Sequence, residues 1–156
     1  MFLHRRAFTL IELLVVTSII GILSGIVLAA LTHARNRSYD VAVKDNLGNV
    51  RTQAGIFYSN NQSYGDGLTI QGDCYHPSDT ATMFKIDPIV ASMIKAADDA
   101  NHGSDVRCTT NTSAGTNASL WSIDSPLIEG GYWCVDAEGS GKIVASRGAD
   151  GACPAS

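Results

Sequence analysis

The sequence predicts an α+β protein in which one long N-terminal helix precedes a small antiparallel β-sheet. No proline interrupts the chain between Phe8 and Tyr75, and this stretch begins with a long apolar run. Short β-branched and aromatic segments, separated by glycine-rich turns, follow near the C-terminus. A composition of 45% apolar and 17% charged residues excludes an intrinsically disordered chain, and 156 residues suffice for one small domain.

The apolar run covers the 24 residues of Phe8–Leu31. A helix of this length extends about 36 Å, more than the ~30 Å hydrocarbon core of a bilayer. The basic residues His4–Arg6 also suit a secretory signal peptide, but the run is too long for one, and Ala29–Ala30 is only a weak cleavage site. We therefore expect a single membrane span with its N-terminus in the cytoplasm, although Arg35 and Arg37 beyond the span weaken that charge bias.

Glu12 is the one ionisable residue inside this run. A carboxylate in an apolar helix is costly unless it is paired, so such a residue suggests a function. Glu12 lies four residues after Phe8. If the mature chain began at Phe8, its new α-amino group could pair with Glu12 of a neighbouring subunit in an apolar core.

The segment Ala7–Val16, AFTLIELLVV, closely resembles the N-terminal signal of type IV pilins and type II secretion pseudopilins. The resemblance implies that a prepilin peptidase cleaves between Ala7 and Phe8, that Phe8 becomes the methylated N-terminus, and that Glu12 is the assembly glutamate. It also implies a leader at residues 1–7. The family usually has glycine before the cut, so Ala7 is a departure and we expect slower processing.

A one-sided apolar stripe continues the helix beyond the span. Its residues recur at steps of three and four, as in an amphipathic helix: Tyr39, Val43, Leu47, Val50, Ala54 and Phe57. We predict one helix from Phe8 to about Ser59. The expected organisation is a leader at 1–7, a transmembrane and assembly helix at 8–31, an amphipathic half at 32–59 and a globular pilin-like head at 60–156.

Residues 60–117 read as loop-rich apart from one short helix. This helix is expected at Pro88–Ala97, because Asp87 can cap it and proline suits a first turn. Its predicted apolar face is Ile89, Val90, Met93, Ile94 and Ala97.

Three strands are predicted after residue 117, at Ser119–Ile123, Gly131–Val135 and Lys142–Ala145. The turn at Glu138–Gly141 joins the last two as a hairpin. The resemblance implies that these strands pack on the amphipathic half of the helix, with an αβ loop before them and a C-terminal loop after them.

Four cysteines, Cys74, Cys108, Cys134 and Cys153, lie in the head. An even number in a small exported domain indicates two disulfides, for which three pairings exist. A zinc site that adds His76 and His102 is the alternative, but no CxxC step supports it. We favour Cys74–Cys108 and Cys134–Cys153, because C-terminal disulfide loops are common in the family that the chain resembles.

The charge and motifs argue against several classes of function. From Ser38 onward there are 7 Lys or Arg and 14 Asp or Glu, so nonspecific nucleic-acid binding is not expected. No nucleophile-base pair or phosphate loop is evident, so we predict neither an enzyme nor a small-molecule substrate. We expect no cofactor. Calcium is a weak alternative. Asp98–Asp105 lacks the closing glutamate of a calcium loop, and the candidate calcium ligands in the C-terminal loops are only Asp136 and Glu138.

The resemblance implies a structural subunit of a type IV pilus-like filament, serving adhesion, motility or DNA uptake. Such a subunit assembles with itself and other pilins into a helical polymer, driven by an assembly ATPase and a platform protein. It starts in the cytoplasmic (inner) membrane with the head outside and ends in an extracellular pilus. A periplasmic pseudopilus of a type II secretion system is the alternative, and a non-assembling, single-pass anchored binding protein is a second one.

Overall fold

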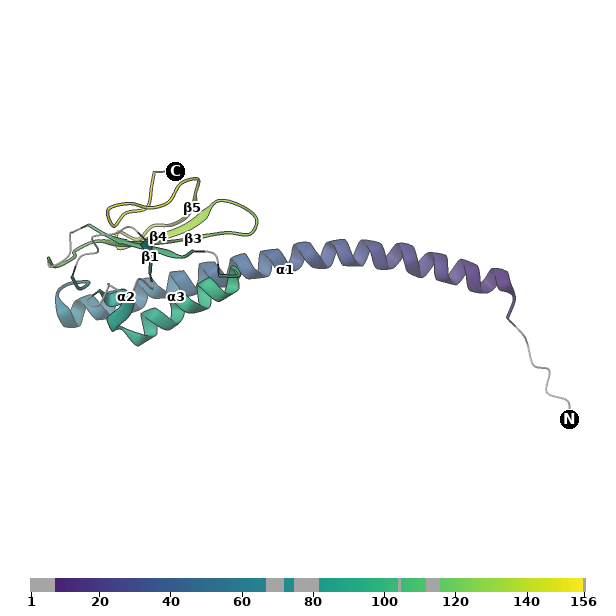
Figure 1. Ribbon diagram of the computed structural model, residues 1–156, viewed down its shortest axis with the longest axis horizontal. Coiled ribbons are helices and arrows are strands. Elements are labelled where there is room, and N and C mark those ends of the chain that lie inside the picture. The colour runs from purple at the N-terminus through teal and green to yellow at the C-terminus, as the bar shows by residue number, and fades with distance from the viewer. Residues whose placement is uncertain (1–7, 67–71, 75–81, 104, 112–115, 156) are drawn as a thin grey trace, which may run out of the picture. The chain divides into compact units, whose positions relative to one another are not determined.

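The computed structural model describes residues 8–66, 72–74, 82–103, 105–111 and 116–155, so the predicted leader lies outside the described residues (Figure 1). The chain divides into two units, Met1–Asn36 and Arg37–Ser156. Helix α1, Leu10–Asn61, contributes residues to both. It begins two residues later and ends two residues later than predicted, and the predicted α+β class with one long N-terminal helix is confirmed.

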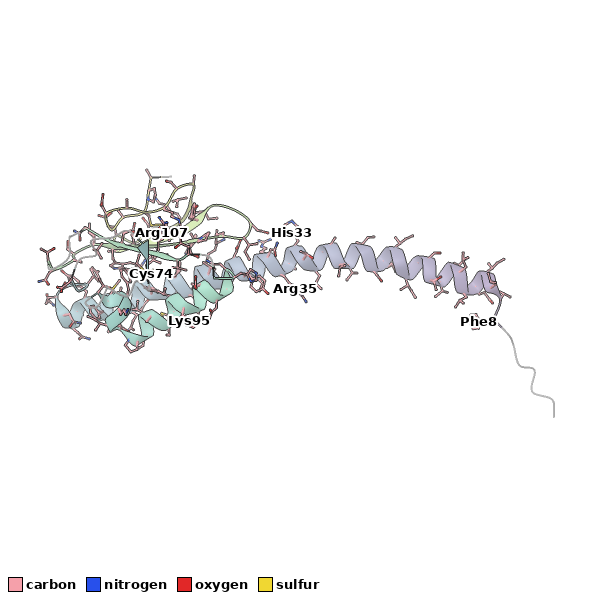
Figure 2. All side chains as sticks on the ribbon, in the orientation of Figure 1. Phe8, His33, Arg35, Cys74, Lys95 and Arg107 are labelled. Carbon is pink, nitrogen blue, oxygen red and sulfur yellow. A yellow bond between two sulfur atoms is a disulfide. The ribbon has the colours of Figure 1, made fainter. Side chains whose placement is uncertain are left out.

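The first unit is a helix that exposes its apolar side chains in every direction (Figure 2). Phe8 is 82% exposed, Leu10 79% and Ile22 67%. By length and composition, α1 is the one helix among the described residues that could cross a membrane. Such a surface is stable when lipid or other apolar helices surround it.

In the second unit, α1 buries one stripe against the rest of the domain. Five of the six predicted stripe residues are buried: Val43, Leu47, Val50, Ala54 and Phe57. The prediction for Tyr39 was wrong, because Tyr39 is 37% exposed and its ring contacts the edge of the His102 ring at 4.8 Å between centroids. Asp40 occupies the buried position instead, because the helical period from Val43 backwards favours residue 40.

Asp40 is only 3% exposed, and its carboxylate binds the loop after the third strand. Its Oδ1 accepts a hydrogen bond from the Ile128 backbone N–H at 2.7 Å, and its Oδ2 accepts one from the Glu129 N–H at 3.2 Å. A buried carboxylate is tolerated when its oxygens are hydrogen-bonded in this way. Asp40 therefore connects α1 to the sheet.

The sheet has five antiparallel strands in the order β1-β2-β3-β4-β5. Their bounds are β1 Gly72–Asp73, β2 Arg107–Thr110, β3 Trp121–Pro126, β4 Tyr132–Asp136 and β5 Gly141–Val144. The last three correspond to the predicted strands, and β4 and β5 form the predicted hairpin. The loop-rich prediction for 60–117 missed β1 and β2, because these short strands lack an alternating apolar pattern and are held in place by pairing with β3.

Two further helices precede the sheet's second strand: α2, Met83–Ile86, which was not predicted, and α3, Pro88–Ala100. Asp87 caps α3 as expected, since its Oδ1 accepts hydrogen bonds from the N–H groups of Ile89 and Val90 at 2.8 and 3.2 Å. Ile89 is 48% exposed, so its assignment to the apolar face was wrong. The residues that α3 buries are Val90, Ile94 and Ala97.

One face of the sheet packs on α3 and the C-terminal half of α1 (Figure 1). Trp121, Ile123 and Val135 point from the strands into this core, where they meet Leu47 and Ile94. Gln53 of α1 donates a hydrogen bond to the capping residue of α3 at 2.8 Å, which aligns the two helices. The opposite face of the sheet carries the polar residues described below.

Replacing Asp40 with alanine should lower the free energy of unfolding by roughly 1.5–3 kcal/mol, because the backbone N–H groups of Ile128 and Glu129 lose the buried carboxylate that accepts their hydrogen bonds. Urea unfolding of the full-length chain in detergent, followed by tryptophan fluorescence, measures the loss. Asp45→Ala is the matched control, since Asp45 lies on the exposed face of the same helix. Equal stabilities of the two variants would contradict the role given to Asp40.

Candidate functional site

The N-terminal end of α1 is organised by a reciprocal pair of hydrogen bonds between Thr9 and Glu12. Thr9 precedes the first helical residue, and Glu12 is the third. The backbone N–H and the hydroxyl of Thr9 both donate to Oε2 of Glu12, at 2.9 and 2.7 Å. The backbone N–H of Glu12 donates to the Thr9 hydroxyl oxygen at 3.2 Å. This arrangement is a capping box, which satisfies two of the free N–H groups at a helix start.

The capping box gives Glu12 a local structural role that the sequence analysis missed. The spacing T-x-x-E before an apolar run is the signal that could have found it. Both bonds from Thr9 go to Oε2, and Oε1 has no protein donor among the described residues. The described part of the chain therefore supplies donors to one of the two carboxylate oxygens of Glu12. Phe8 is adjacent and 82% exposed, whereas Ala7 lies outside the described residues.

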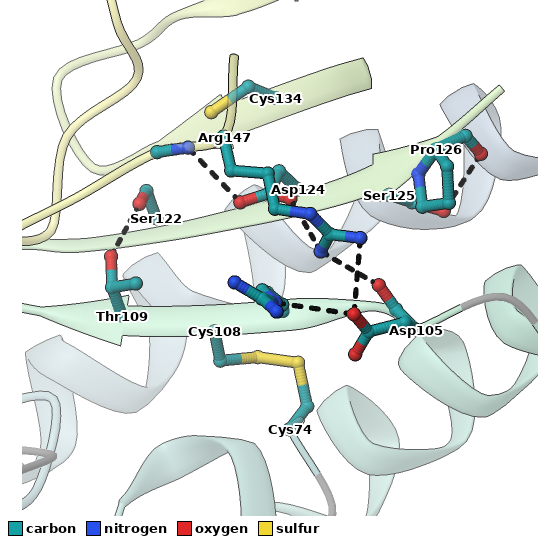
Figure 3. A network of polar contacts seen from close by, with 12 residues as sticks. Cys74, Asp105, Cys108, Thr109, Ser122, Asp124, Ser125, Pro126, Cys134 and Arg147 are labelled. Atoms are coloured by element: carbon teal, nitrogen blue, oxygen red, sulfur yellow. Dashed lines mark hydrogen bonds and ion pairs between the residues drawn. A yellow bond between two sulfur atoms is a disulfide. The ribbon is translucent and has the colours of Figure 1, made fainter. Parts of the chain in front are cut away.

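A second polar cluster lies on the face of the sheet that points away from α1, which we call the polar face. Successive side chains along β2, β3 and β4 point to opposite faces of the sheet. The residues that alternate with the core residues therefore point to the polar face. Four of these side chains are 2% exposed or less: Thr109, Ser122, Asp124 and Asp136. Hydroxyl groups of Thr109 and Ser122 lie 2.7 Å apart on neighbouring strands (Figure 3).

The C-terminal segment Arg147–Cys153 binds these buried polar groups. The Gly148 N–H donates to Oδ2 of Asp124 at 3.2 Å, and the Cys153 N–H donates to Oδ2 of Asp136 at 3.1 Å. The Gly151 N–H donates to the Thr109 hydroxyl at 3.1 Å. The segment therefore attaches to three successive strands through backbone N–H groups, which explains why polar residues are buried there.

A charged network extends from the polar face to its edge (Figure 3). Arg147 Nη1 lies 3.1 Å from Oδ1 of Asp124, and its Nη2 lies 3.2 Å from Oδ2 of Asp105. Arg107 pairs with the same Asp105 oxygen at 3.3 Å. The Arg147 guanidinium also lies over the Tyr132 ring, 4.8 Å from its centroid. Arg147 is thus held by two carboxylates and an aromatic ring.

The two buried carboxylates differ in their acidity. Burial raises the pKa of Asp124, and the nearby Arg147 guanidinium and the Gly148 N–H reduce that rise without cancelling it. Burial also raises the pKa of Asp136, but hydrogen bonds from the backbone N–H groups of Ser140 and Cys153 outweigh it, so the pKa of Asp136 is lowered overall. Asp136 therefore favours its ionised form in the folded protein.

Two disulfides are present, and they join the pairs that the sequence analysis favoured. Cys74, which follows β1, is bonded to Cys108 in β2, with 5.0 Å between Cα atoms. Cys134 in β4 is bonded to Cys153 in the C-terminal segment, with 5.7 Å between Cα atoms. All four sulfurs are used in these bonds, so the zinc alternative finds no thiolate ligand, and His76 lies outside the described residues.

The carboxylates considered as calcium ligands are either bound by other protein groups or exposed without other carboxylates grouped around them in the described residues. Both oxygens of Asp136 accept backbone N–H groups, with Ser140 at 2.8 Å from Oδ1, while Glu138 is exposed. Of the acidic residues in Asp98–Asp105, Asp99 in the last turn of α3 pairs with Lys95 of the same helix at 2.9 Å, and Asp105 after the helix pairs with Arg107 and Arg147. In the described part of the chain, no three His, Cys, Asp or Glu side chains form a group that could hold a metal ion.

Comparison with known proteins identifies the N-terminal segment. A family model described as the prokaryotic N-terminal methylation motif matches residues 3–28, which include Phe8, Thr9 and Glu12. This match supports the type IV pilin and pseudopilin family, whose members are structural rather than catalytic. No curated protein and no solved structure was found to match the chain.

Asp136→Asn should reduce stability at neutral pH by roughly 1–3 kcal/mol, because an amide cannot accept from both backbone N–H groups as a carboxylate does. The lowered pKa of Asp136 means that its contribution is complete above the unfolded-state value of 3.8 and is lost as the pH falls through the folded-state value. The gap between wild type and variant should therefore narrow on acidification below that value.

Urea unfolding of the full-length chain in detergent, repeated across this pH range, measures the gap. Asp150→Asn is the control, because Asp150 is exposed in the same C-terminal region. A gap that is independent of pH would contradict the assignment of the charge to Asp136.

Proposed function

We propose that this chain, a precursor with the N-terminal segment of the type IV pilin and pseudopilin family, is the structural subunit of a type IV pilus-like filament. The observation that carries the proposal is the joining of the methylation motif to a helix whose apolar side chains are exposed and whose one ionisable group from Phe8 to Leu31 is Glu12. The filament would serve adhesion, motility or DNA uptake at the cell surface.

The proposed assembly satisfies two requirements of this helix, apolar surroundings for its surface and a cation for Glu12. In the precursor, lipid surrounds the apolar surface, and Thr9 satisfies one oxygen of Glu12. A prepilin peptidase removes residues 1–7 between Ala7 and Phe8 and the new amino group of Phe8 is methylated, which leaves a cation at the start of the helix. Oε1 of Glu12 then pairs with the Phe8 amine of a neighbouring subunit. Pairing cancels two charges that are costly in an apolar bundle, so it favours correctly registered subunits.

The head supports a pilus subunit over a secretion pseudopilin. Two disulfides hold its loops, and protein groups already bind the oxygens of the two buried carboxylates on the polar face. In particular, the Arg147 guanidinium supplies the positive charge beside Asp124. A head stabilised in this way does not need a metal ion to order its C-terminal segment.

Calcium should therefore leave the melting temperature of the full-length chain in detergent unchanged within about 1 °C, because a ligand stabilises a protein only by binding its folded state. Scanning calorimetry with excess calcium chloride, and again with a chelator, provides the comparison. A rise of several degrees that disappears in Asp136→Asn would favour the pseudopilin alternative.

Two substitutions at Glu12 separate charge pairing from helix capping. Glu12→Gln keeps a side chain that can complete the capping box but removes the charge, whereas Glu12→Ala removes both. We expect both variants to lose filaments by at least about tenfold, because each leaves the Phe8 amine without a counter-charge. The measurement is the amount of subunit in filaments sheared from cells of the native host, with N-terminal sequencing to show that each mature chain begins at Phe8.

Asp45→Asn serves as the control, since it removes a carboxylate from the exposed face of α1. Normal filaments from Glu12→Gln but not from Glu12→Ala would assign Glu12 to capping instead of pairing. A wild-type chain that is processed, exported and never found in filaments would support the anchored binding protein.

A further inference from the structure

Two arginines follow the apolar run at the end of the span nearest the head. Leu31 is the last residue of the run, and Arg35 lies four residues later, about 6 Å along the helix. Arg35 and Arg37 are both exposed, and Arg35 projects away from α1 (Figure 2). Among the described residues, neither guanidinium has a carboxylate within salt-bridge distance, unlike Arg107 and Arg147.

The position of Arg35 and Arg37 works against the expected orientation of the precursor, in which the head lies outside the cytoplasm. Basic residues beside a span favour the cytoplasmic side, and Arg5 and Arg6 set that side at the other end of the run. Two further arginines just outside the span reduce this bias. A compensating interaction at the outer surface of the membrane would explain their presence.

The helical period places the two arginines on different sides of α1. Residues two apart are separated by about 200° around a helix, so Arg35 and Arg37 project in nearly opposite directions. A single protein surface would contact one side of the helix. A layer of lipid headgroups surrounds a spanning helix completely, so it can bind both guanidinium groups at once.

The spacing along the helix fits the same layer. From Leu10, the first residue of α1, to Arg35 the helix rises 25 steps of about 1.5 Å, or about 38 Å, and Phe8 lies just before this start. A bilayer measured with its headgroups is about 40–45 Å thick. The Phe8 end and Arg35 can therefore lie in the two headgroup layers of one membrane at the same time.

We propose that Arg35 and Arg37 form a belt that binds the phosphates of phospholipid headgroups in the outer leaflet of the cytoplasmic membrane. Guanidinium groups donate two parallel hydrogen bonds to phosphate oxygens, so the belt fixes the depth of the precursor. It also offsets repulsion of the head, where 14 acidic residues outnumber 7 basic ones from Ser38 onward. This proposal requires the membrane-anchored precursor of the proposed function, but it does not require that the precursor assembles into a filament.

The depth of a spin label at residue 34 tests the belt. The full-length Ala34→Cys chain, labelled with a nitroxide, is reconstituted in vesicles of phosphatidylcholine and phosphatidylglycerol. Collision with a neutral water-soluble nickel complex, relative to oxygen, reports depth. In the double variant Arg35→Gln/Arg37→Gln this ratio should rise about twofold, because the acidic head draws away from the anionic surface once the belt is removed.

A matched double variant, Lys95→Gln/Lys142→Gln, removes the same charge from α3 and β5 and should leave the ratio unchanged. In vesicles of a phosphate-free glycosyl diacylglycerol, the wild-type chain and Arg35→Gln/Arg37→Gln should give the same ratio.

Equal ratios for wild type and Arg35→Gln/Arg37→Gln in phospholipid vesicles would overturn the proposal, as would an equal rise in the lysine variant. Filament assembly does not enter these measurements, so a failure of the proposed function is seen separately.

Discussion

An apolar helix with exposed side chains must be surrounded by lipid or by other apolar helices, and much of this molecule follows from that requirement. The surface from Phe8 to Leu31 can move from a bilayer to a helical bundle with little change in hydrophobic free energy, because both exclude water. Charge is what distinguishes the two surroundings. Glu12 is acceptable near a membrane surface and needs a cation inside a bundle, so in the assembly that we propose the same residue connects membrane insertion to filament formation.

The second unit has a different requirement. Helices cover one face of its small sheet, so the other face must be covered by another part of the chain. The C-terminal segment closes it with hydrogen bonds instead of apolar packing, because Asp124, Asp136 and Thr109 each accept a backbone N–H from it. The Cys134–Cys153 disulfide holds the segment in the same place. Stability there depends on satisfied polar groups, which small domains with little core can use in combination with disulfides.

Local patterns allowed much of this structure to be predicted. The period of α1, the Asp87-Pro88 start of α3 and the β4–β5 hairpin all depend on neighbouring residues, and each was recognised in the sequence. Apart from the local capping box at Thr9 and Glu12, the main errors occurred where residues distant in the sequence decide the structure. β2 is a strand because it pairs with β3, and Asp40 is buried because the loop after β3 supplies two N–H groups to its carboxylate. Neither partner is visible in the local sequence.

The sequence by itself determined the membrane span, the methylation motif and the isolated carboxylate at Glu12, because each depends on the order of residues along one helix. Tertiary structure alone decided that Asp40, Asp124 and Asp136 are buried and that the C-terminal segment covers the polar face of the sheet. These features depend on distances between atoms that folding brings together. The sequence shows which hydrogen-bond donors and acceptors are present, but only the fold determines which of them bond to one another.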